Sequence, residues 1–151
     1  AFAHFISGDA AEITRMYRRH FRPSSRLAEP RVLIAIAGLA ADTLEEAEEL
    51  AATIDLWRLR IRHGVDLPVP SREEALAYPY TPYDREEIRY NRRRLTLGTP
   101  RGVRDRIEEI ASAHEADEAM VLTITPDYES RARSYALLAQ AFALGRALTE
   151  V

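Results

Sequence analysis

The side chains best suited to chemistry in this sequence are one histidine near its start and two threonines near its last apolar run. His4 belongs to the residue type that titrates near neutral pH, so it can hold or move a proton as well as form a hydrogen bond. Thr123 and Thr125 are two residues apart, so their hydroxyl groups point to the same side of an extended strand. All three lie near the end of a run with the character of a strand. We therefore predict a site that binds a small molecule through hydrogen bonds and local proton transfer.

Each of these residues also has a simpler interpretation. His4 can equally be a partly buried side chain that is hydrogen-bonded to a neighbour, and the two threonines suit a strand because they are β-branched. Gly98-Thr99-Pro100 places backbone amides at the start of a helix, where an anion can bind. A helix cap followed by a turn is the interpretation that we favour for this segment.

Two further groups of side chains carry charge or aromatic rings. Four arginines within residues 89–94 can bind phosphate or an anionic substrate, but acidic residues precede them by one or two helical turns. We therefore predict a solvated, internally paired helix and no binding of nucleic acid. Three tyrosines within residues 78–83 either line a substrate cleft or anchor a proline-rich loop. The arginines are Arg89, Arg92, Arg93 and Arg94, and the tyrosines are Tyr78, Tyr80 and Tyr83.

The composition excludes several kinds of chemistry. The 151 residues include no cysteine, which excludes thiol nucleophiles, disulfides and thiolate metal sites within them. All 21 basic residues are arginine, which excludes a Schiff base on lysine. The four histidines are far apart and match no metal-binding spacing, so we expect no metal site. The net charge of −3 favours neither nucleic acid nor a membrane surface, and we see no membrane span or secretory leader, so we expect a cytoplasmic protein.

An alternation of strands and helices must position these side chains. Asp9 and Glu12 form a candidate capping box for the first helix, and Asp42-Thr43 opens a long helix that Gly64 ends. Thr99-Pro100 opens another helix, with proline at its first position. The expected strands cover residues 1–6, 31–39, 95–98 and 118–125, and the last helix covers residues 127–148.

Helical spacing predicts which side chains of these helices face the core. The expected inward residues are Ile13, Met16, Tyr17 and Phe21 in the first helix, Leu44, Ala47, Leu50, Ala51, Ile54, Trp57 and Ile61 in the long helix, Val103, Ile107 and Ile110 in the helix after Thr99, and Ala132, Tyr135, Leu138 and Phe142 in the last. We expect all of them to serve packing.

Residues 65–94 interrupt the alternation. This segment holds four prolines, a short helix expected around residues 71–77 and a charged helix expected over residues 84–94. Long ordered loops in compact domains are often functional lids. We therefore expect a lid-like insertion within a single domain of residues 1–151.

The side-chain pattern within the strands predicts which way they face. Large aliphatic residues alternate with smaller or more polar ones, and we expect the large ones to meet helices and the small ones to face a barrel interior. The large side chains are Val32, Ile34, Ile36, Met120, Leu122 and Ile124, and the others are Ala35, Ala37, Val121, Thr123 and Thr125. Active sites of α/β barrels lie at the carboxyl ends of the strands, where both threonines are expected. The predicted fold is α/β, a partial (β/α)8 TIM barrel.

The order of several short motifs resembles the C-terminal part of bacterial luciferase-like flavin monooxygenases. The motifs that carry the resemblance are Ala1-Phe2-Ala3-His4-Phe5, Tyr17 with Phe21-Arg22-Pro23-Ser24, Ala40-Ala41-Asp42-Thr43 with Glu46-Ala47, Gly98-Thr99-Pro100 with Val103-Arg104, Ala116-Asp117-Glu118 with Met120-Val121, and Arg131 with Arg133-Ser134-Tyr135 and Leu137-Leu138-Ala139. Their order and spacing extend over essentially the whole chain.

The resemblance implies a TIM barrel in which reduced FMN and dioxygen oxygenate a small organic substrate. The chain matches about the last three strands of such a barrel, so the main flavin-phosphate loop and the best-known catalytic positions of the family have no counterpart in it. The resemblance leaves His4 as the catalytic candidate, and Phe5, Thr123 and Thr125 as cofactor-binding candidates. A deazaflavin (coenzyme F420) in place of FMN is an alternative of the same superfamily.

Other interpretations concern the chain as a whole. A sector of a barrel leaves one sheet face and both edges open, and open edges favour pairing with another chain. We therefore expect a homo-oligomer or a missing N-terminal half, with a flavin reductase as a further possible partner, and an isolated chain that is inactive. A non-catalytic fragment that is stable only through assembly is the alternative function. A small doubly wound sheet is the last alternative, because no glycine-rich phosphate loop is present.

Overall fold

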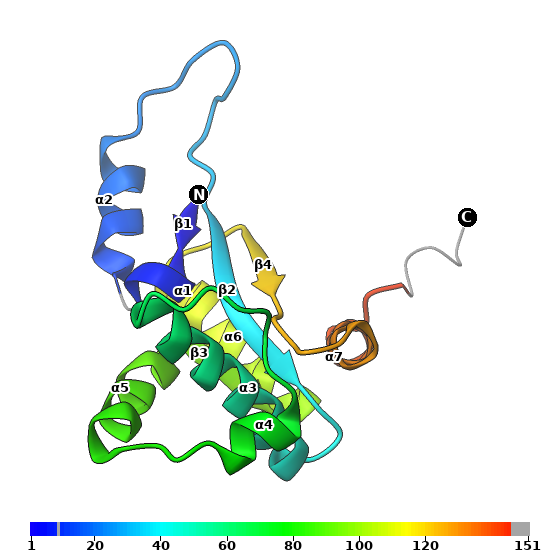
Figure 1. Cartoon of the computed structure of the whole chain (residues 1–151). Coiled ribbons are helices and arrows are strands. Elements are labelled where there is room, and N and C mark those ends of the chain that lie inside the picture. Colours follow the sequence, from blue (N-terminus) through cyan, green and yellow to red (C-terminus); the bar gives the residue numbers. More distant parts are fainter. Residues whose placement is uncertain (9, 146–151) are drawn as a thin grey trace.

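The computed structural model describes residues 1–8 and 10–145 of the chain. Within them, four parallel strands form one sheet (Figure 1). The strands are β1 (Phe2–Ala3), β2 (Leu33–Ala40), β3 (Leu95–Gly98) and β4 (Glu118–Leu122). The helices are α1 (His4–Ser7), α2 (Ala11–His20), α3 (Leu44–Arg62), α4 (Arg72–Ala77), α5 (Pro82–Arg92), α6 (Pro100–Ala113) and α7 (Tyr128–Ala141).

Strand β2 is the centre of the sheet, because it pairs with all three other strands. Ala37 is aligned with Leu95 of β3 and with Leu122 of β4, so β3 and β4 lie on opposite edges of β2. Strand β1 pairs with residues 34–35 of β2, and β4 pairs with the same residues. Because β4 occupies one edge of β2 there, β1 lies along the other edge, the one that also pairs with β3. Figure 1 shows β2 between β1 and β4.

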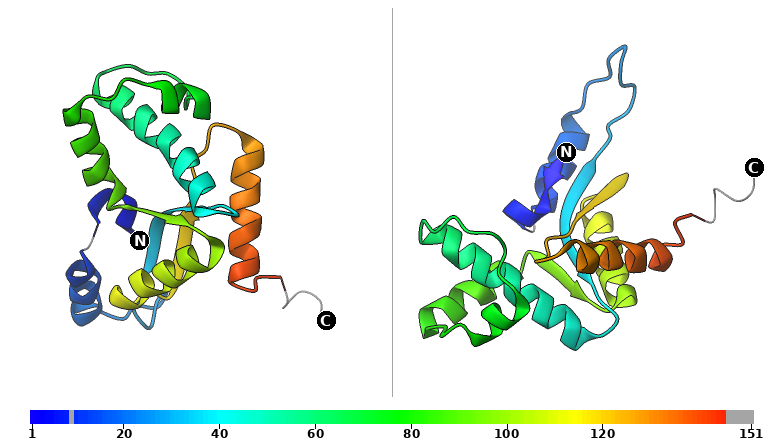
Figure 2. Two further views of the ribbon diagram at one scale, coloured as in Figure 1. Left: turned by 90° about the horizontal axis from the view of Figure 1, so that it is seen from below. Right: turned by 45° about the vertical axis from the view of Figure 1, so that its right-hand side comes forward.

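The sheet is parallel and mixed with helices, as predicted, but the partial barrel is not confirmed. Consecutive strands of a barrel pair in chain order, whereas β4 pairs here with β2, and β3 and β4 are not paired within the described residues. The left view of Figure 2 shows α3, α4 and α5 on one side of the strands and α6 on the other.

Local sequence signals explain where most helices begin. The side-chain oxygen of each N-cap residue accepts a hydrogen bond from a backbone N–H in the first turn, as expected for such residues. These caps are Thr43 on α3, Ser71 on α4, Thr81 on α5, Thr99 on α6 and Asp127 on α7. The predicted start of the long helix and the predicted cap at Thr99 are therefore confirmed. The predicted cap at Asp9 falls outside the described residues.

Two strands are shorter than predicted. Only Phe2 and Ala3 of the expected first strand pair with β2, and the chain then turns into the short helix α1, so His4 begins a helix instead of ending a strand. Strand β4 ends at Leu122, three residues before the expected end. Strand β2 and its burial on both faces agree with the prediction.

One face of the sheet packs against α6 and α7. The core on this face, which we call the helix-covered face, consists of Val32 just before β2, Ile34, Ile36 and Ala40 from β2, Val103, Ile107 and Ile110 from α6, and Leu137 and Leu138 from α7. The predicted inward residues of α6 and the predicted direction of Ile34 and Ile36 are therefore confirmed. On the opposite side, Leu39 and Ala41 pack against Ala47, Leu50, Ala51 and Ile54 of α3.

The predicted direction of β4 is wrong. Val121 packs against the helix-covered face, whereas Met120 is 54% exposed and Leu122 is 39% exposed. The register explains the reversal, because Met120 is aligned with Ala35 and Leu122 with Ala37, and aligned residues of neighbouring strands point to the same face. We call the face that carries Ala35, Ala37, Met120 and Leu122 the open face.

Helices α2 and α7 also differ from the prediction. In α2 three of the expected inward residues, Ile13, Met16 and Tyr17, are exposed, Ile13 by 52%, and Thr14 is the buried side chain. The fourth, Phe21, is half-buried and follows the end of the helix.

In α7 Leu138 is buried and Phe142 packs against the core, as predicted, whereas Ala132 and Tyr135 are exposed. Ser134 is buried in addition, and its hydroxyl accepts a hydrogen bond from the backbone N–H of Ala40 (2.9 Å).

Residues 65–94 form α4, α5 and their connections, as predicted. Both helices pack against α3. Tyr80 anchors this segment, since its hydroxyl donates a hydrogen bond to the carbonyl oxygen of Ala75 (3.0 Å) and its ring lies 4.9 Å from that of Tyr78. Burial raises the pKa of Tyr80 to about 12. These contacts agree with the loop-anchoring interpretation of the tyrosines.

Candidate functional site

A cavity of about 270 Å³ lies on the open face of the sheet. Five elements or their ends supply its walls, from α1 at the start of the chain to the residues that follow β4. The lining residues are Phe5, Ala37, Ile54, Trp57, Arg58, Leu95, Leu122 and Ile124. Seven of the eight are apolar, and the exception is an arginine.

The backbone explains why a cavity forms here. Ala37 is buried in the centre of β2, and its small side chain leaves space that a larger residue would fill. Phe5 follows the end of β1, and Leu122 and Ile124 lie at and just after the end of β4. Helix α3 closes the opposite wall with Ile54, Trp57 and Arg58, which are spaced to share one helical face. The cavity therefore gathers the carboxyl ends of β1 and β4, where α/β sheets commonly place their sites.

Charged residues of α3 and α5 flank the cavity. Asp55 is buried and forms a bidentate contact with Arg92, whose Nε lies 3.0 Å from Oδ1 and 2.9 Å from Oδ2. Burial raises the pKa of Asp55, and the hydrogen bonds from Arg92 oppose that rise. Burial also lowers the pKa of Arg58, and the neighbouring guanidinium of Arg94 lowers it further.

This arrangement differs from the predicted internally paired arginine helix. Arg92 pairs with Asp55 and Glu48 of α3, and Glu87 of α5 pairs with Arg62 of α3. Asp84 instead caps its own helix, since its carboxylate accepts hydrogen bonds from the backbone N–H and the hydroxyl of Thr81. The charges of α5 therefore attach it to α3.

Of the four predicted site residues, Phe5 lines the cavity. His4 is buried next to it in the chain but is not among the lining residues. Its ring lies 5.9 Å from the ring of His114, which in turn lies 4.9 Å from the ring of Phe2. Nδ1 of His114 is 3.3 Å from the hydroxyl of Thr14. His4 thus belongs to a buried group that joins α1, α2 and the end of α6.

Thr123 and Thr125 are buried, on either side of the cavity residue Ile124 in the chain. The hydroxyl of Thr123 donates a hydrogen bond to the carbonyl oxygen of Gly38, and that of Thr125 donates one to the carbonyl oxygen of Asp127, both at 2.7 Å. Both hydroxyl protons are therefore used by the backbone, and neither threonine is among the residues that line the cavity.

The sequence prediction missed most of the cavity walls. Trp57 lines the cavity although the helical spacing predicts it as a packing side chain, and Arg58 was not among the predicted site residues. A signal for them existed, because Ile54, Trp57 and Arg58 follow the i, i+3, i+4 spacing of one helical face. Only tertiary structure brings this face against Phe5 and Leu122.

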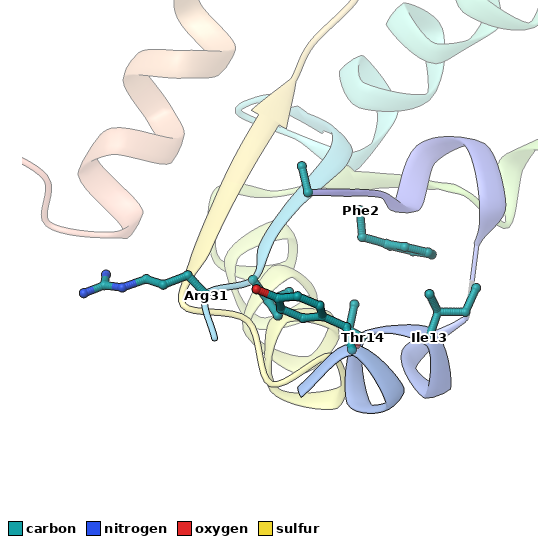
Figure 3. Close-up of a pocket in the computed structure, with 7 residues that line it drawn as sticks. Phe2, Ile13, Thr14 and Arg31 are labelled. Carbon is teal, nitrogen blue, oxygen red and sulfur yellow. The ribbon is translucent and has the colours of Figure 1, made fainter. Parts of the chain in front are cut away.

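A second cavity, of about 290 Å³, lies between α2 and the beginnings of β1 and β2 (Figure 3). Phe2, Ile13 and Thr14 surround it, and the side chain of Arg31 points away from it. A third cavity, of about 520 Å³, lies between β4, α6 and α7 and includes Val121 and Tyr135. We favour the cavity on the open face as the candidate site. Of these three cavities within the described residues, it is the one that lies at the carboxyl ends of strands and has a charged side chain, Arg58, beside apolar walls.

Two other expectations concern metals and membranes. Among residues 1–8 and 10–145, no three His, Asp or Glu side chains are grouped to hold a metal ion. No helix in this part of the chain combines the length and the apolar character needed to cross a bilayer.

Thr99 caps α6 by accepting a hydrogen bond from the N–H of Gly102 (3.4 Å), in agreement with the cap interpretation of Gly98-Thr99-Pro100.

The chain is similar to several known proteins, although no protein-family model matches it. It is 43% identical over 142 residues to the uncharacterized protein YceB of Bacillus subtilis, covering 93% of this chain and 43% of YceB. The crystal structure of apo-MsnO8 superimposes with a TM-score of 0.82 and 34% identity, covering 94% of this chain and 44% of that one. The chain thus spans about two fifths of the length of these relatives.

Two relatives with names that describe an activity are more distant. A luciferase-like monooxygenase of Escherichia coli is 27% identical over 138 residues, covering 91% of this chain and 41% of the enzyme. An N-acetyl-S-alkylcysteine monooxygenase of Bacillus subtilis is 27% identical over 143 residues, covering 93% of this chain and 42% of the enzyme. These named homologues support a relationship between this chain and the luciferase-like superfamily.

Proposed function

We propose that this chain is part of a luciferase-like monooxygenase that uses reduced FMN and dioxygen to oxygenate a small organic substrate. The observation that carries the proposal is the similarity to a luciferase-like monooxygenase over 91% of the chain, in a fold whose apolar cavity contains the predicted cofactor residue Phe5. The chain supplies one part of the site, with residues 65–94 as a lid-like insertion of its domain.

The cavity walls suit a flavin. An aromatic and aliphatic lining fits the faces of a flat ring system, and Phe5, Trp57 and Leu122 provide it. Reduced flavin, when bound, supplies the electrons that activate dioxygen. The role of this chain is then to bind the ring and to exclude water with Leu122 and Ile124.

His4, Thr123 and Thr125 keep the roles that we predicted for them, now as part of this proposal. His4 lies buried beside Phe5 in the chain, so it would act through a hydrogen bond or a local proton transfer next to the cavity. Thr123 and Thr125 would accept hydrogen bonds from the cofactor through their remaining lone pairs. A deazaflavin fits the same apolar walls, and a separate reductase would supply a reduced flavin.

Assembly is the second part of the proposal. The edge of β4 opposite β2 is unpaired within the described residues, and Ile13, Met16 and Met120 are exposed. Apolar side chains and free strand edges of this kind favour association. We propose that a second copy or a further segment of the protein covers them, and that the chain alone is inactive.

Anaerobic titration of the protein with reduced FMN, followed by the fluorescence of its single tryptophan, Trp57, tests the proposed cofactor. We expect saturable quenching. Ala37→Leu should weaken binding at least about tenfold, or about 1.4 kcal/mol, because it fills the cavity.

Ala139→Leu is the matched control, since Ala139 lines the third cavity, and it should bind reduced FMN as the unchanged protein does. Reduced F420 in the same titration distinguishes the two flavins. Absence of binding for both flavins would contradict the proposed function.

A further inference from the structure

Arg58 is unusual among the arginines near the cavity, because no carboxylate of the described residues forms a direct ion pair with it, and Asp55 attracts it only at longer range. Its side chain lines an otherwise apolar cavity, and within the described part of the chain it makes neither a hydrogen bond nor an ion pair. A partly buried cation without a direct partner is unfavourable, and proteins normally pair such a charge. The site is therefore short of one negative group.

The neighbouring side chains do not supply that group. Asp55 is the nearby buried carboxylate, and Arg92 already occupies both of its oxygens. Arg94 adds positive charge, since its guanidinium donates hydrogen bonds to two neutral oxygens, the carbonyl of Ile6 (2.7 Å) and Oδ1 of Asn91 (2.6 Å). Asp55 thus faces two guanidinium groups, those of Arg92 and Arg58, and Arg94 adds a third positive charge next to Arg58.

The shape of the cavity restricts what can neutralise Arg58. The space is about 270 Å³, and its other walls include Phe5, Leu122 and Ile124. A ligand that satisfies both features has an anionic group at one end and a compact apolar body. The planar guanidinium can hold the two oxygens of a carboxylate or a phosphate at once.

We propose that Arg58 binds the anionic oxygens of a ligand in this cavity, either an acidic substrate next to the flavin or the flavin itself, with the apolar part of that ligand against Phe5, Leu122 and Ile124. The inference rests on the proposed function and names the substrate class of the same site as acidic and partly apolar. The anionic oxygens can belong to the carboxylate of a substrate or to the phosphate of the flavin, and the experiment below separates these two sources.

The test compares hexanoate with hexanamide, which share an apolar body and differ in charge. Their binding to the protein is followed by the fluorescence of Trp57, which lines the cavity. We expect hexanoate to bind at least tenfold more tightly. Arg58→Gln should remove this preference, whereas Arg101→Gln, a change at a side chain of α6 that is 87% exposed, should keep it. Equal affinities in the unchanged protein, or a preference that persists in Arg58→Gln, would overturn the inference.

Arg58→Lys provides a second variant if the glutamine variant does not fold. It keeps the charge but loses the planar fork, so the preference for hexanoate should fall several-fold and still favour the anion. An unchanged preference in Arg58→Lys would contradict the bidentate contact and with it the inference.

FMN and riboflavin form the second arm, since they differ by the phosphate. If Arg58→Gln weakens FMN but not riboflavin, the anion site is that of the cofactor phosphate. If it affects neither and abolishes only the hexanoate preference, the site is that of the substrate. Both results support the anion site. A protein that prefers hexanoate but binds no flavin would contradict the proposed function and leave this inference standing.

Discussion

The two faces of the sheet differ in how completely the chain covers them. On the helix-covered face, Ile34 and Ile36 are fully buried by side chains of α6 and α7. On the open face of the same strands, Ala37 borders a cavity, and Met120 and Leu122 are partly exposed. The comparison teaches that α6 and α7 cover one face fully, whereas α3 covers only part of the other and leaves a cavity and exposed side chains of β4 for a ligand or a partner.

The physical basis of this difference is the amount of apolar surface that each face removes from water. Full burial of an isoleucine contributes about 1.5–3 kcal/mol, whereas an alanine contributes far less and a half-exposed leucine only part of its area. Substitutions on the helix-covered face should therefore affect folding, and substitutions on the open face should affect binding.

The largest expected effect is on the helix-covered face. Ile36→Ala should lower the free energy of unfolding by about 2–5 kcal/mol, because it leaves a cavity between β2, α6 and α7. Urea denaturation followed by circular dichroism measures the change. Leu122→Ala on the open face is the control and should cost less than about 1 kcal/mol. Equal losses in the two variants would remove the distinction between the faces.

A smaller effect is expected at Gly38, where β2 and β4 are in close contact. A Cβ atom at this position would lie 2.7 Å from Cγ1 of Val121, which is too close without a shift of the strands. Gly38→Ala should therefore destabilise the protein by about 1–3 kcal/mol in the same denaturation experiment. The double variant Gly38→Ala with Val121→Ala should recover part of this loss. If the single variant is as stable as the unchanged protein, β4 does not pack in this register.

The smallest effect concerns two carboxylates on different sides of the molecule. Asp117 accepts a hydrogen bond from the N–H of Val32 (2.7 Å), and this bond lowers the pKa of Asp117 below 3.8. Its contribution to stability is present above pH 3.8 and is lost as the pH falls through the lowered pKa. Asp55 has the opposite sign, because burial raises its pKa above 3.8, so its contribution is present below pH 3.8 and is lost as the pH rises through the raised pKa.

Unfolding midpoints measured between pH 2.5 and 6 check both signs. In Asp117→Asn the unfolding midpoint should fall less steeply as the pH decreases below 3.8. In Asp55→Asn the midpoint should fall less steeply as the pH increases above 3.8. If both substitutions change the pH dependence of the unfolding midpoint in the same direction, the opposite pKa shifts of Asp117 and Asp55 are contradicted.

The sequence predicted the elements well where the signals are local. Thr43 and Thr99 begin their helices as expected, and Val103 with its partners on α6 faces the core, because caps and helical spacing act within a few residues. The direction of β4 was predicted wrongly, because residue size does not fix a face. The face depends on the alignment of Met120 with Ala35, a contact between residues far apart in the chain.

The site was predicted only in part for the same reason. Phe5 was a cofactor-binding candidate implied by the family resemblance, and it lines the cavity. Helical spacing places Trp57 and Arg58 on the same face as Ile54, but it does not reveal that α3 packs across the open face and brings them to the cavity. The exposure of Ile13 likewise depends on what lies beside α2, which helical spacing does not reveal.

Amide hydrogen exchange with and without reduced FMN tests most directly the claim that the open face holds the ligand. We predict slower exchange in residues 4–7, 54–58 and 120–124 when reduced FMN is present, and no change in residues 103–111 of α6. Protection confined to α6 and α7, or no protection near Phe5 and Ile124, would contradict the assignment of the cavity as the site.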